Sequence, residues 1–244
     1  ELLRMLKSNN TALVLCGHGS SFGSYEQDFK KNHRMIEKKI HTNCYYCFIE
    51  KNQPNIENCL KDIQKKGVKT VFFFPFLLFN GEHFEKDIKA KIKELSENLK
   101  LEIKLIDKIS LTKDVMPIVK KKISQILKPN KTNILVTFCS KSKNSKVISE
   151  LKIYTQKLAE NLNIAFAYSF FVGEEAEFLK KIKNHEREGY FLIVQPIFLF
   201  KGYLQNKNLD FFNQLNSNSH QVLSTLMGIS DIQTLVVKKA RKYF

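Results

Sequence analysis

The sequence predicts an α/β protein of two similar lobes, each with a parallel four-stranded sheet flanked by helices. Short apolar runs of strand length alternate with longer helical patterns, which is typical of parallel sheets. This alternation occurs four times before Pro129 and four times after it. The segment Pro75–Gly81 (PFLLFNG) is also repeated at Pro196–Gly202 (PIFLFKG) without a gap. We therefore expect a tandem duplication, with lobes at residues 1–129 and 130–244 and a cleft between them.

The first lobe is expected to contain four strand–helix units. Its strands are nearly continuous apolar runs, which indicates that both faces of the sheet are buried. Its helices carry apolar residues on one face, and glycine or proline marks several of their ends. The predicted strands are 11–16, 44–50, 68–74 and 101–106, and the predicted helices are 25–40, 54–66, 83–99 and 112–127.

The second lobe repeats this order but lacks two histidines. Aligned by its repeat, it has Phe138 in the place of His18 and Leu204 in the place of His83. Because the scaffold residues recur and the histidines do not, we expect the histidines to serve chemistry in the first lobe only. The predicted strands are 133–138, 164–172, 190–195 and 220–226, and the predicted helices are 144–162, 174–183, 204–215 and 229–243.

The composition is that of a globular protein with a basic surface. Hydrophobic residues make up 43% of the chain, and the formal net charge is +16. The charge is spread over both halves, which disfavours a nucleic-acid binder and leaves a lysine-rich solvated surface or an anionic small molecule. The 5 cysteines have irregular spacing. With no signal peptide and no apolar run near the ~20 residues that span a bilayer, we expect a cytoplasmic chain that enters no membrane.

Three side chains follow predicted strands and are candidates for one site. His18 lies in the turn Gly17–Ser20 (GHGS), Glu50 ends the second strand, and His83 follows the third strand. Because the carboxyl ends of parallel strands meet at one edge of a sheet, we expect these groups to lie together. Two imidazoles and a carboxylate suit an open site for divalent cobalt, iron, nickel or zinc. The bland alternatives are a surface histidine at His18 and a helix cap at His83.

Two residues are candidates for supporting roles, and other residues are set aside. Asp87, one helical turn after His83, is expected either to orient that imidazole or to complement the helix dipole. Ser20 shares the glycine-rich turn of His18. His33 is expected to be solvated on a charged helix face. Cys44 and Cys47 are expected on opposite faces of a strand, which disfavours a redox or zinc pair.

Two stretches of the first lobe resemble a known family. LVLCGHGSS (Leu13–Ser21) and FPFLLFNGEHFEKDI (Phe74–Ile88) resemble the signature segments of the sirohydrochlorin chelatases, ATP-independent enzymes that place cobalt or iron in a tetrapyrrole. The resemblance extends over the whole chain, since the long form of that family is a tandem duplication. It implies that His18 and His83 bind the incoming metal and take up pyrrole protons. It also implies, less directly, that Glu50 matches an acidic position of related chelatases.

The resemblance implies insertion of Co²⁺, or alternatively Fe²⁺, into sirohydrochlorin during cobalamin or sirohaem biosynthesis. The sequence has no phosphate-binding loop, so neither ATP nor any cofactor beyond the substrate metal ion is expected. Sirohydrochlorin is a polycarboxylate, and the positive charge would steer it toward the protein. The expected partners are the tetrapyrrole and the metal ion, and a duplicated chain can act as a monomer. The alternative is a non-catalytic tetrapyrrole or metal carrier with the same fold.

Overall fold

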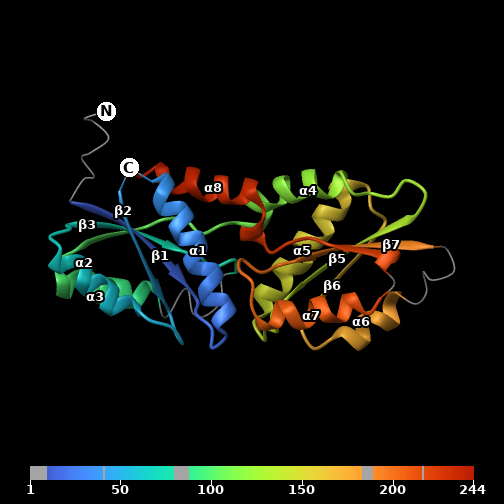
Figure 1. Cartoon of the computed structure of the whole chain (residues 1–244), viewed down its shortest axis with the longest axis horizontal. Helices are drawn as coiled ribbons and strands as arrows, with labels where there is room; N and C mark the ends of the chain where they lie inside the picture. Colours follow the sequence, from blue (N-terminus) through green and yellow to red (C-terminus); the bar gives the residue numbers. More distant parts are fainter. Residues whose placement is uncertain (1–9, 41, 80–87, 183–188, 216) are drawn as a thin grey trace. The chain divides into compact units, whose positions relative to one another are not determined.

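Two four-stranded parallel sheets form the framework of the protein (Figure 1). The structure is a computed structural model that describes residues 10–40, 42–79, 88–182, 189–215 and 217–244. The first sheet has the strand order β2-β1-β3-β4, and the second has the order β6-β5-β7-β8. The two orders correspond strand for strand, so the predicted fold class is confirmed.

Strands and helices alternate along the chain as the sequence predicts. The strands are β1 (Thr11–Gly17), β2 (Asn43–Phe48), β3 (Thr70–Pro75), β4 (Glu102–Leu105), β5 (Thr132–Cys139), β6 (Phe166–Phe171), β7 (Tyr190–Pro196) and β8 (His220–Val222). The α-helices are α1 (Gly23–Lys39), α2 (Ile56–Lys65), α3 (Lys89–Leu99), α4 (Met116–Ser124), α5 (Ser145–Leu162), α6 (Glu175–Ile182), α7 (Tyr203–Asn213) and α8 (Ser230–Arg241). Within the described residues, none of these helices has the length and apolarity needed to cross a bilayer.

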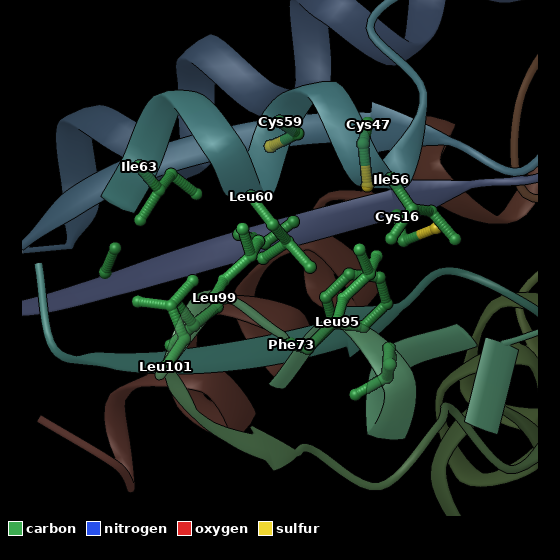
Figure 2. Close-up of a cluster of buried hydrophobic side chains, with 14 of the residues drawn as sticks. Cys16, Cys47, Ile56, Cys59, Leu60, Ile63, Phe73, Leu95, Leu99 and Leu101 are labelled. Carbon is green, nitrogen blue, oxygen red and sulfur yellow. The ribbon is translucent and has the colours of Figure 1, made fainter. Parts of the chain in front are cut away.

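The first sheet is buried on both faces, as its continuous apolar strands require. On one face, alternate residues of β1 and β3 pack against α2 and α3 (Figure 2). On the other face, the ring of Phe29 in α1 lies 4.9 Å from the ring of Phe48 in β2. Phe72 in β3 meets Phe244, just beyond α8, with ring centroids 4.8 Å apart. With both faces covered, the carboxyl edge of the sheet is where polar side chains can reach a ligand.

The cysteines belong to the cores and form no disulfides. All five are buried free thiols. Cys16, Cys47 and Cys59 lie in the cluster between the first sheet and α2 (Figure 2). Burial raises the pKa of the Cys47 thiol, and its hydrogen bonds with the other two thiols add to the effect. Their burial makes these three residues packing groups of the core.

The second sheet has a comparable apolar core. Alternate residues of β5 and β7 pack against α6 and α7, where Phe138, Phe170 and Phe178 form a stack of rings. The opposite face contains a buried polar contact, in which the hydroxyl oxygens of Thr137 and Thr155 are 2.5 Å apart. The second sheet thus has an apolar core of its own.

The compact units of the chain differ from the lobes that the repeat predicts. Unit 1 consists of Glu1–Ile109 with Gln233–Phe244, and unit 2 consists of Ser110–Ile232. The predicted boundary at Pro129 would place α4 in the first lobe and α8 in the second. Instead, α4 packs with α5 in unit 2, whereas most of α8 packs beside α1 in unit 1. Periodicity shows that a helix has an apolar face, but it does not say which sheet that face covers.

Strand β8 is shorter than the sequence predicts. It covers His220–Val222 instead of residues 220–226, and a 3-10 turn at Leu226–Gly228 follows it. The N–H of Leu226 donates to the carbonyl of Phe198, in the loop after β7. Leu223 N–H still donates to Val194 O of β7, whereas Leu226 and Met227 bond to the loop after β7 and so do not extend the strand.

The prediction that His33 is solvated is wrong. The side chain is buried with 7% relative exposure, and its Nε2 lies 3.1 Å from the carbonyl oxygen of Cys44. Its ring packs edge-on against Tyr46, with centroids 4.9 Å apart. Burial lowers the pKa of His33, so the imidazole is held in its neutral form. His33 lies on the same helical stripe as the buried Phe29 and Ile36, and this spacing decides its environment more than its charged neighbours do.

Candidate active site

His18 stands at the carboxyl edge of the first sheet, immediately after β1. Its Nδ1 lies 3.2 Å from the carbonyl oxygen of Gly19. A carbonyl only accepts hydrogen bonds, so this contact favours the tautomer in which Nδ1 carries the proton. In that tautomer the lone pair is on Nε2, which is the atom that can bind a cation. The side chain is 40% exposed, so a ligand can reach it from solvent.

Glu50 meets His18 at this edge. Its Oε1 lies 3.6 Å from His18 Nδ1, and its side chain is 43% exposed. Beyond the end of β2, Ile49 N–H donates to Gly17 O and Glu50 N–H donates to His18 O, both at 3.0 Å. These bonds carry the β1–β2 pairing into the two loops. Glu50 lies just beyond the end of β2 rather than in the strand. The structure thus brings these two candidate residues together, whereas their chemical roles stay predictions.

Both glycines of the His18 turn are required by close packing. A Cβ on Gly19 would lie 1.7 Å from the carbonyl oxygen of Glu50, and the φ of Gly19 is +97°. A Cβ on Gly17 would lie 2.7 Å from the ring of Phe29. The N–H of Gly19 donates to the hydroxyl of Tyr25 at 3.4 Å, and burial raises the pKa of that phenol. Only glycine lets the backbone pass so close to the second loop.

The loop that carries Glu50 turns sharply through Lys51. The N–H of Asn52 donates to Glu50 O at 2.7 Å, across a residue with a φ of +65°. A hydrogen bond to the second residue along, with a left-handed residue between, is the pattern of a γ-turn, which is strained in this form. Strained backbone of this kind is common at functional sites.

Asn52 also contacts two residues on the His18 side of the site. Its Oδ1 accepts from Ser20 N–H at 2.6 Å, and its Nδ2 donates to Glu26 Oε2 at 2.9 Å. The ammonium of Lys30, 2.5 Å from Glu26 Oε1, holds the pKa of Glu26 below its usual range. Sequence reasoning identified Ser20 as a supporting residue but missed Asn52 and Glu26. No local spacing signals contacts between residues so far apart in the chain.

His83 and Asp87 lie outside the described residues. The start of the segment that leads to them is described: Phe76 N–H donates to Cys16 O at 2.7 Å, so the chain leaves β3 at the edge that carries His18. Lys108 Nζ donates to Leu78 O at 2.9 Å. Within the described residues, no three His, Cys, Asp or Glu side chains form a group able to hold a metal ion. Of the predicted trio, the described structure thus contains the pair His18 and Glu50.

The strand register corrects the alignment of the two halves at His18. Cys16 of β1 is opposite Pro75 of β3, and Phe138 of β5 is opposite Pro196 of β7. Phe138 is therefore the counterpart of Cys16, not of His18. The predicted counterpart of His18 lies two residues before the one that the register gives. The proline shared by the two halves fixes the register, whereas an apolar strand residue resembles many others.

The true counterparts of His18 and Glu50 carry neither an imidazole nor a carboxylate. Val172 N–H donates to Cys139 O, just as Ile49 N–H donates to Gly17 O. Counting on from these equivalent pairs, Ser140 takes the place of His18, and Gly173 takes the place of Glu50. The second sheet thus keeps the backbone pairing at its carboxyl edge without the candidate side chains.

Comparisons with known proteins point to one family. The model of the CbiX family matches residues 12–126. The chain is 30% identical, over 122 residues, to a sirohydrochlorin cobaltochelatase of Sulfolobus acidocaldarius, and the match covers 47% of this chain and 91% of that protein. Among solved structures, SirB from Bacillus subtilis with Fe³⁺ superposes with a TM-score of 0.77 at 17% identity, covering 96% of this chain and 95% of SirB.

A second solved structure agrees on the fold. SirB from Bacillus subtilis subspecies spizizenii, in complex with cobalt, has a TM-score of 0.73 at 15% identity and covers 96% of this chain and 94% of its own. Both structural matches span nearly the whole chain, so they show that the fold of both halves is shared. The sequence match covers about half of the chain, and the family model matches the half that carries His18 and Glu50.

Proposed function

This chain belongs to the CbiX family of sirohydrochlorin chelatases, and we propose that the carboxyl edge of its first sheet inserts a divalent metal ion into sirohydrochlorin. The observation that carries this proposal is the pair formed by His18 and Glu50. The two side chains meet at an exposed sheet edge, within the half of the chain that the family model matches. The equivalent edge of the second sheet has Ser140 and Gly173 instead.

The chemistry of insertion suits this pair. The ion must lose water, and the macrocycle must release two N–H protons as the metal–nitrogen bonds form. In the tautomer favoured by Gly19 O, His18 offers the Nε2 lone pair, first to the ion and then to a pyrrole proton. The carboxylate of Glu50, 3.6 Å from Nδ1, stabilises the imidazolium that results and can pass the proton on to water.

His83 is the third group in the proposal. Its support is the sequence segment in which it lies, directly after the third predicted strand. We propose that it binds the same ion as His18, that Asp87 orients it, and that Glu50 either completes the ligand set or relays the proton. Two imidazoles leave positions on the metal for water and for the incoming pyrrole nitrogens.

Cobalt is the proposed metal, with iron as the alternative. The sequence relative of Sulfolobus acidocaldarius is a cobaltochelatase, whereas the SirB structures contain Fe³⁺ and cobalt. These ions share ligand types, and affinity order does not decide metal choice in cells. We propose that the reaction uses neither ATP nor a resident cofactor, because the metal ion is itself the substrate. Competition between Co²⁺ and Fe²⁺ in one insertion assay decides between the two metals.

An anaerobic absorbance assay with sirohydrochlorin and Co²⁺ tests the proposal. We expect His18→Ala and His83→Ala each to lower the insertion rate about 100-fold or more, which is the usual effect of removing a proton-transfer group. Ser140→Ala, at the equivalent edge of the second sheet, is the matched control and is expected to keep the parent rate. Variants as fast as the parent would show that the site is misassigned. If the parent protein binds the tetrapyrrole or the metal tightly but inserts metal no faster than the uncatalysed reaction, the protein is a carrier.

A further inference from the structure

The two loops that carry His18 and Glu50 are joined by backbone hydrogen bonds, and the side chain of Asn52 adds a further link between them. Its backbone N–H donates to Glu50 O at 2.7 Å, and its Oδ1 accepts from Ser20 N–H at 2.6 Å. We propose that Asn52 is a positioning residue that sets the distance between His18 and Glu50. This inference rests on the proposed function in that it assigns Asn52 to the same site.

The Asn52 amide has a single orientation that satisfies both of its contacts. Ser20 N–H is a donor, so it needs the amide oxygen, whereas the carboxylate of Glu26 accepts only and needs the amide nitrogen. Nδ2 donates to Glu26 Oε2 at 2.9 Å, and Glu26 is held in turn by Lys30. A rotation of the amide by 180° would place oxygen against carboxylate and nitrogen against an N–H group. The contacts therefore fix this side chain.

The His18 turn is held to the Glu50 loop by the backbone bond from Glu50 N–H to His18 O, and to α1 by the bond from Gly19 N–H to the Tyr25 hydroxyl. Gly17 and Gly19 flank the imidazole, and glycine has the widest choice of backbone conformations. The hydroxyl of Ser20 accepts from Phe22 N–H at 3.2 Å, which organises the turn internally but does not join it to the Glu50 loop. The Ser20 N–H bond to Asn52 supplies that side-chain link. Holding reacting groups in place is a large part of what an active site contributes.

The second half of the chain repeats the internal turn at Ser20 but not the link between the two loops. Ser142, the counterpart of Ser20, accepts from Asn144 N–H at 3.1 Å and so repeats the internal turn. By residue count, Glu175 is the counterpart of Asn52, but its Oε1 accepts from Gly173 N–H within its own loop. Ile148 stands where α1 has Glu26. Both halves therefore have the internal turn. The Ser20–Asn52–Glu26 link occurs in the half that has the His18–Glu50 pair, and its counterpart residues in the other half do not form it.

A pair of substitutions that keep side-chain size tests this role. Asn52→Asp still accepts from Ser20 N–H, but it places a second carboxylate against Glu26. Adding Glu26→Gln to Asn52→Asp supplies an amide donor to the introduced carboxylate and restores the pairing with its polarity reversed. The matched control is Asn144→Asp, since Asn144 caps α5 in unit 2 by accepting from Lys146 N–H, and Asp caps a helix equally well.

The measurements are kcat and KM for Co²⁺ in the insertion assay, Co²⁺ affinity by calorimetry without tetrapyrrole, and the thermal midpoint. We expect Asn52→Asp to raise KM and weaken Co²⁺ binding about 10-fold or more, as is usual for groups that orient a metal ligand. The kcat should change less, and the thermal midpoint should stay near the parent value. The double variant should return to within about threefold of the parent, because the two substitutions are coupled. Asn144→Asp should match the parent.

Parent-like Co²⁺ binding by Asn52→Asp, or a double variant as impaired as the single one, overturns the proposal. If Asn52→Asp does not fold, a folded double variant with parent affinity still supports the proposal, and an unfolded one overturns it. If the parent inserts no metal, the proposed function fails on its own. Calorimetry then decides about Asn52, because weakened Co²⁺ binding that the double variant restores needs no turnover.

Discussion

The turn after β1 and the turn after β5 start from equivalent strands and end at equivalent helices, yet they are built differently. In the first, Gly17 leaves room for the large rings of Phe29 and Tyr25. In the second, the counterparts by register and residue count are Cys139, Leu151 and Val147, all buried, so the strand ends in a larger residue and the helix carries smaller ones. The end of β5 at Cys139 is thus filled by core packing, while the turn that follows it, from Ser140 to Lys143, lies near the surface.

The backbone differs in the same way as the side chains. Gly19 has a φ of +97° in the first turn, whereas its counterpart Lys141 is not among the residues with positive φ. After β2, the left-handed position falls on Lys51, a residue with a side chain, whereas after β6 it falls on Gly173. A left-handed residue other than glycine costs about 1–3 kcal/mol. The first edge keeps this strain at Lys51, beside the His18–Glu50 pair, so we propose that the Lys51 turn serves the proposed site.

The largest expected difference between the two edges is in their tolerance of a methyl group. Gly19→Ala adds a Cβ that would overlap the Glu50 carbonyl, whereas Gly173→Ala, at a similar φ of +103°, meets nothing within 4 Å. We expect Gly173→Ala to cost about 1–2 kcal/mol of unfolding free energy, from its φ alone. Gly19→Ala should cost about 3 kcal/mol or more, since overlap with backbone is added to the strain.

Urea unfolding followed by circular dichroism measures both variants, since the chain has no tryptophan. Gly19→Ala should also lose insertion activity, because the carbonyl it displaces belongs to Glu50. Equal losses of stability in the two variants would show that the close approach of the loops is not a real constraint.

The strands were predictable because each is a run of apolar residues bounded by turn residues, and parallel sheets need such runs. The position of His18 and Glu50 at one edge followed from the same rule. The sheet that α4 covers did not follow, because an apolar periodicity does not say which sheet a helix packs against. Asn52 and Glu26 were not predictable either, since their contacts join loops that are distant in sequence. The counterpart of His18 required the hydrogen-bond register, which places Ser140 there and not Phe138.

Glu50→Gln should have a smaller effect than loss of either histidine. The substitution keeps the shape of the side chain but removes the charge that faces His18 Nδ1. We expect a fall of about 10-fold in kcat for insertion, near the lower end of the range for proton-transfer groups, because both side chains are exposed and water can replace the carboxylate in part.

The matched control is Glu174→Gln, just after β6, where Glu174 Oε2 accepts from Phe171 N–H in the second unit. That variant should insert metal at the parent rate. If Glu50→Gln has the same kcat as the parent, the Glu50 carboxylate has no part in proton transfer, and the role of Glu50 is limited to the backbone of its turn.

The smallest expected effect is a pH dependence of the unfolding free energy that comes from His33 in unit 1. His33 in α1 is buried and neutral, and its counterpart in α5 by residue count is the buried Thr155, which does not titrate. Because burial lowers the pKa of His33 in the folded chain, the unfolded chain binds a proton first as the pH falls below about 6.5. The histidine therefore lowers stability progressively below that pH and has no such effect above it.

His33→Gln keeps an N–H donor for the carbonyl of Cys44 and removes the titration. We expect this variant to lose less unfolding free energy than the parent between about pH 7.5 and about pH 5.5, where the unfolded histidine takes up its proton. Thr155→Val removes the hydroxyl paired with Thr137. Its unfolding free energy should fall below that of the parent by the same amount at both pH values. If the parent and His33→Gln changed equally with pH, the imidazole would already be protonated or solvated in the fold. Burial of His33 would then not distinguish the first unit from the second.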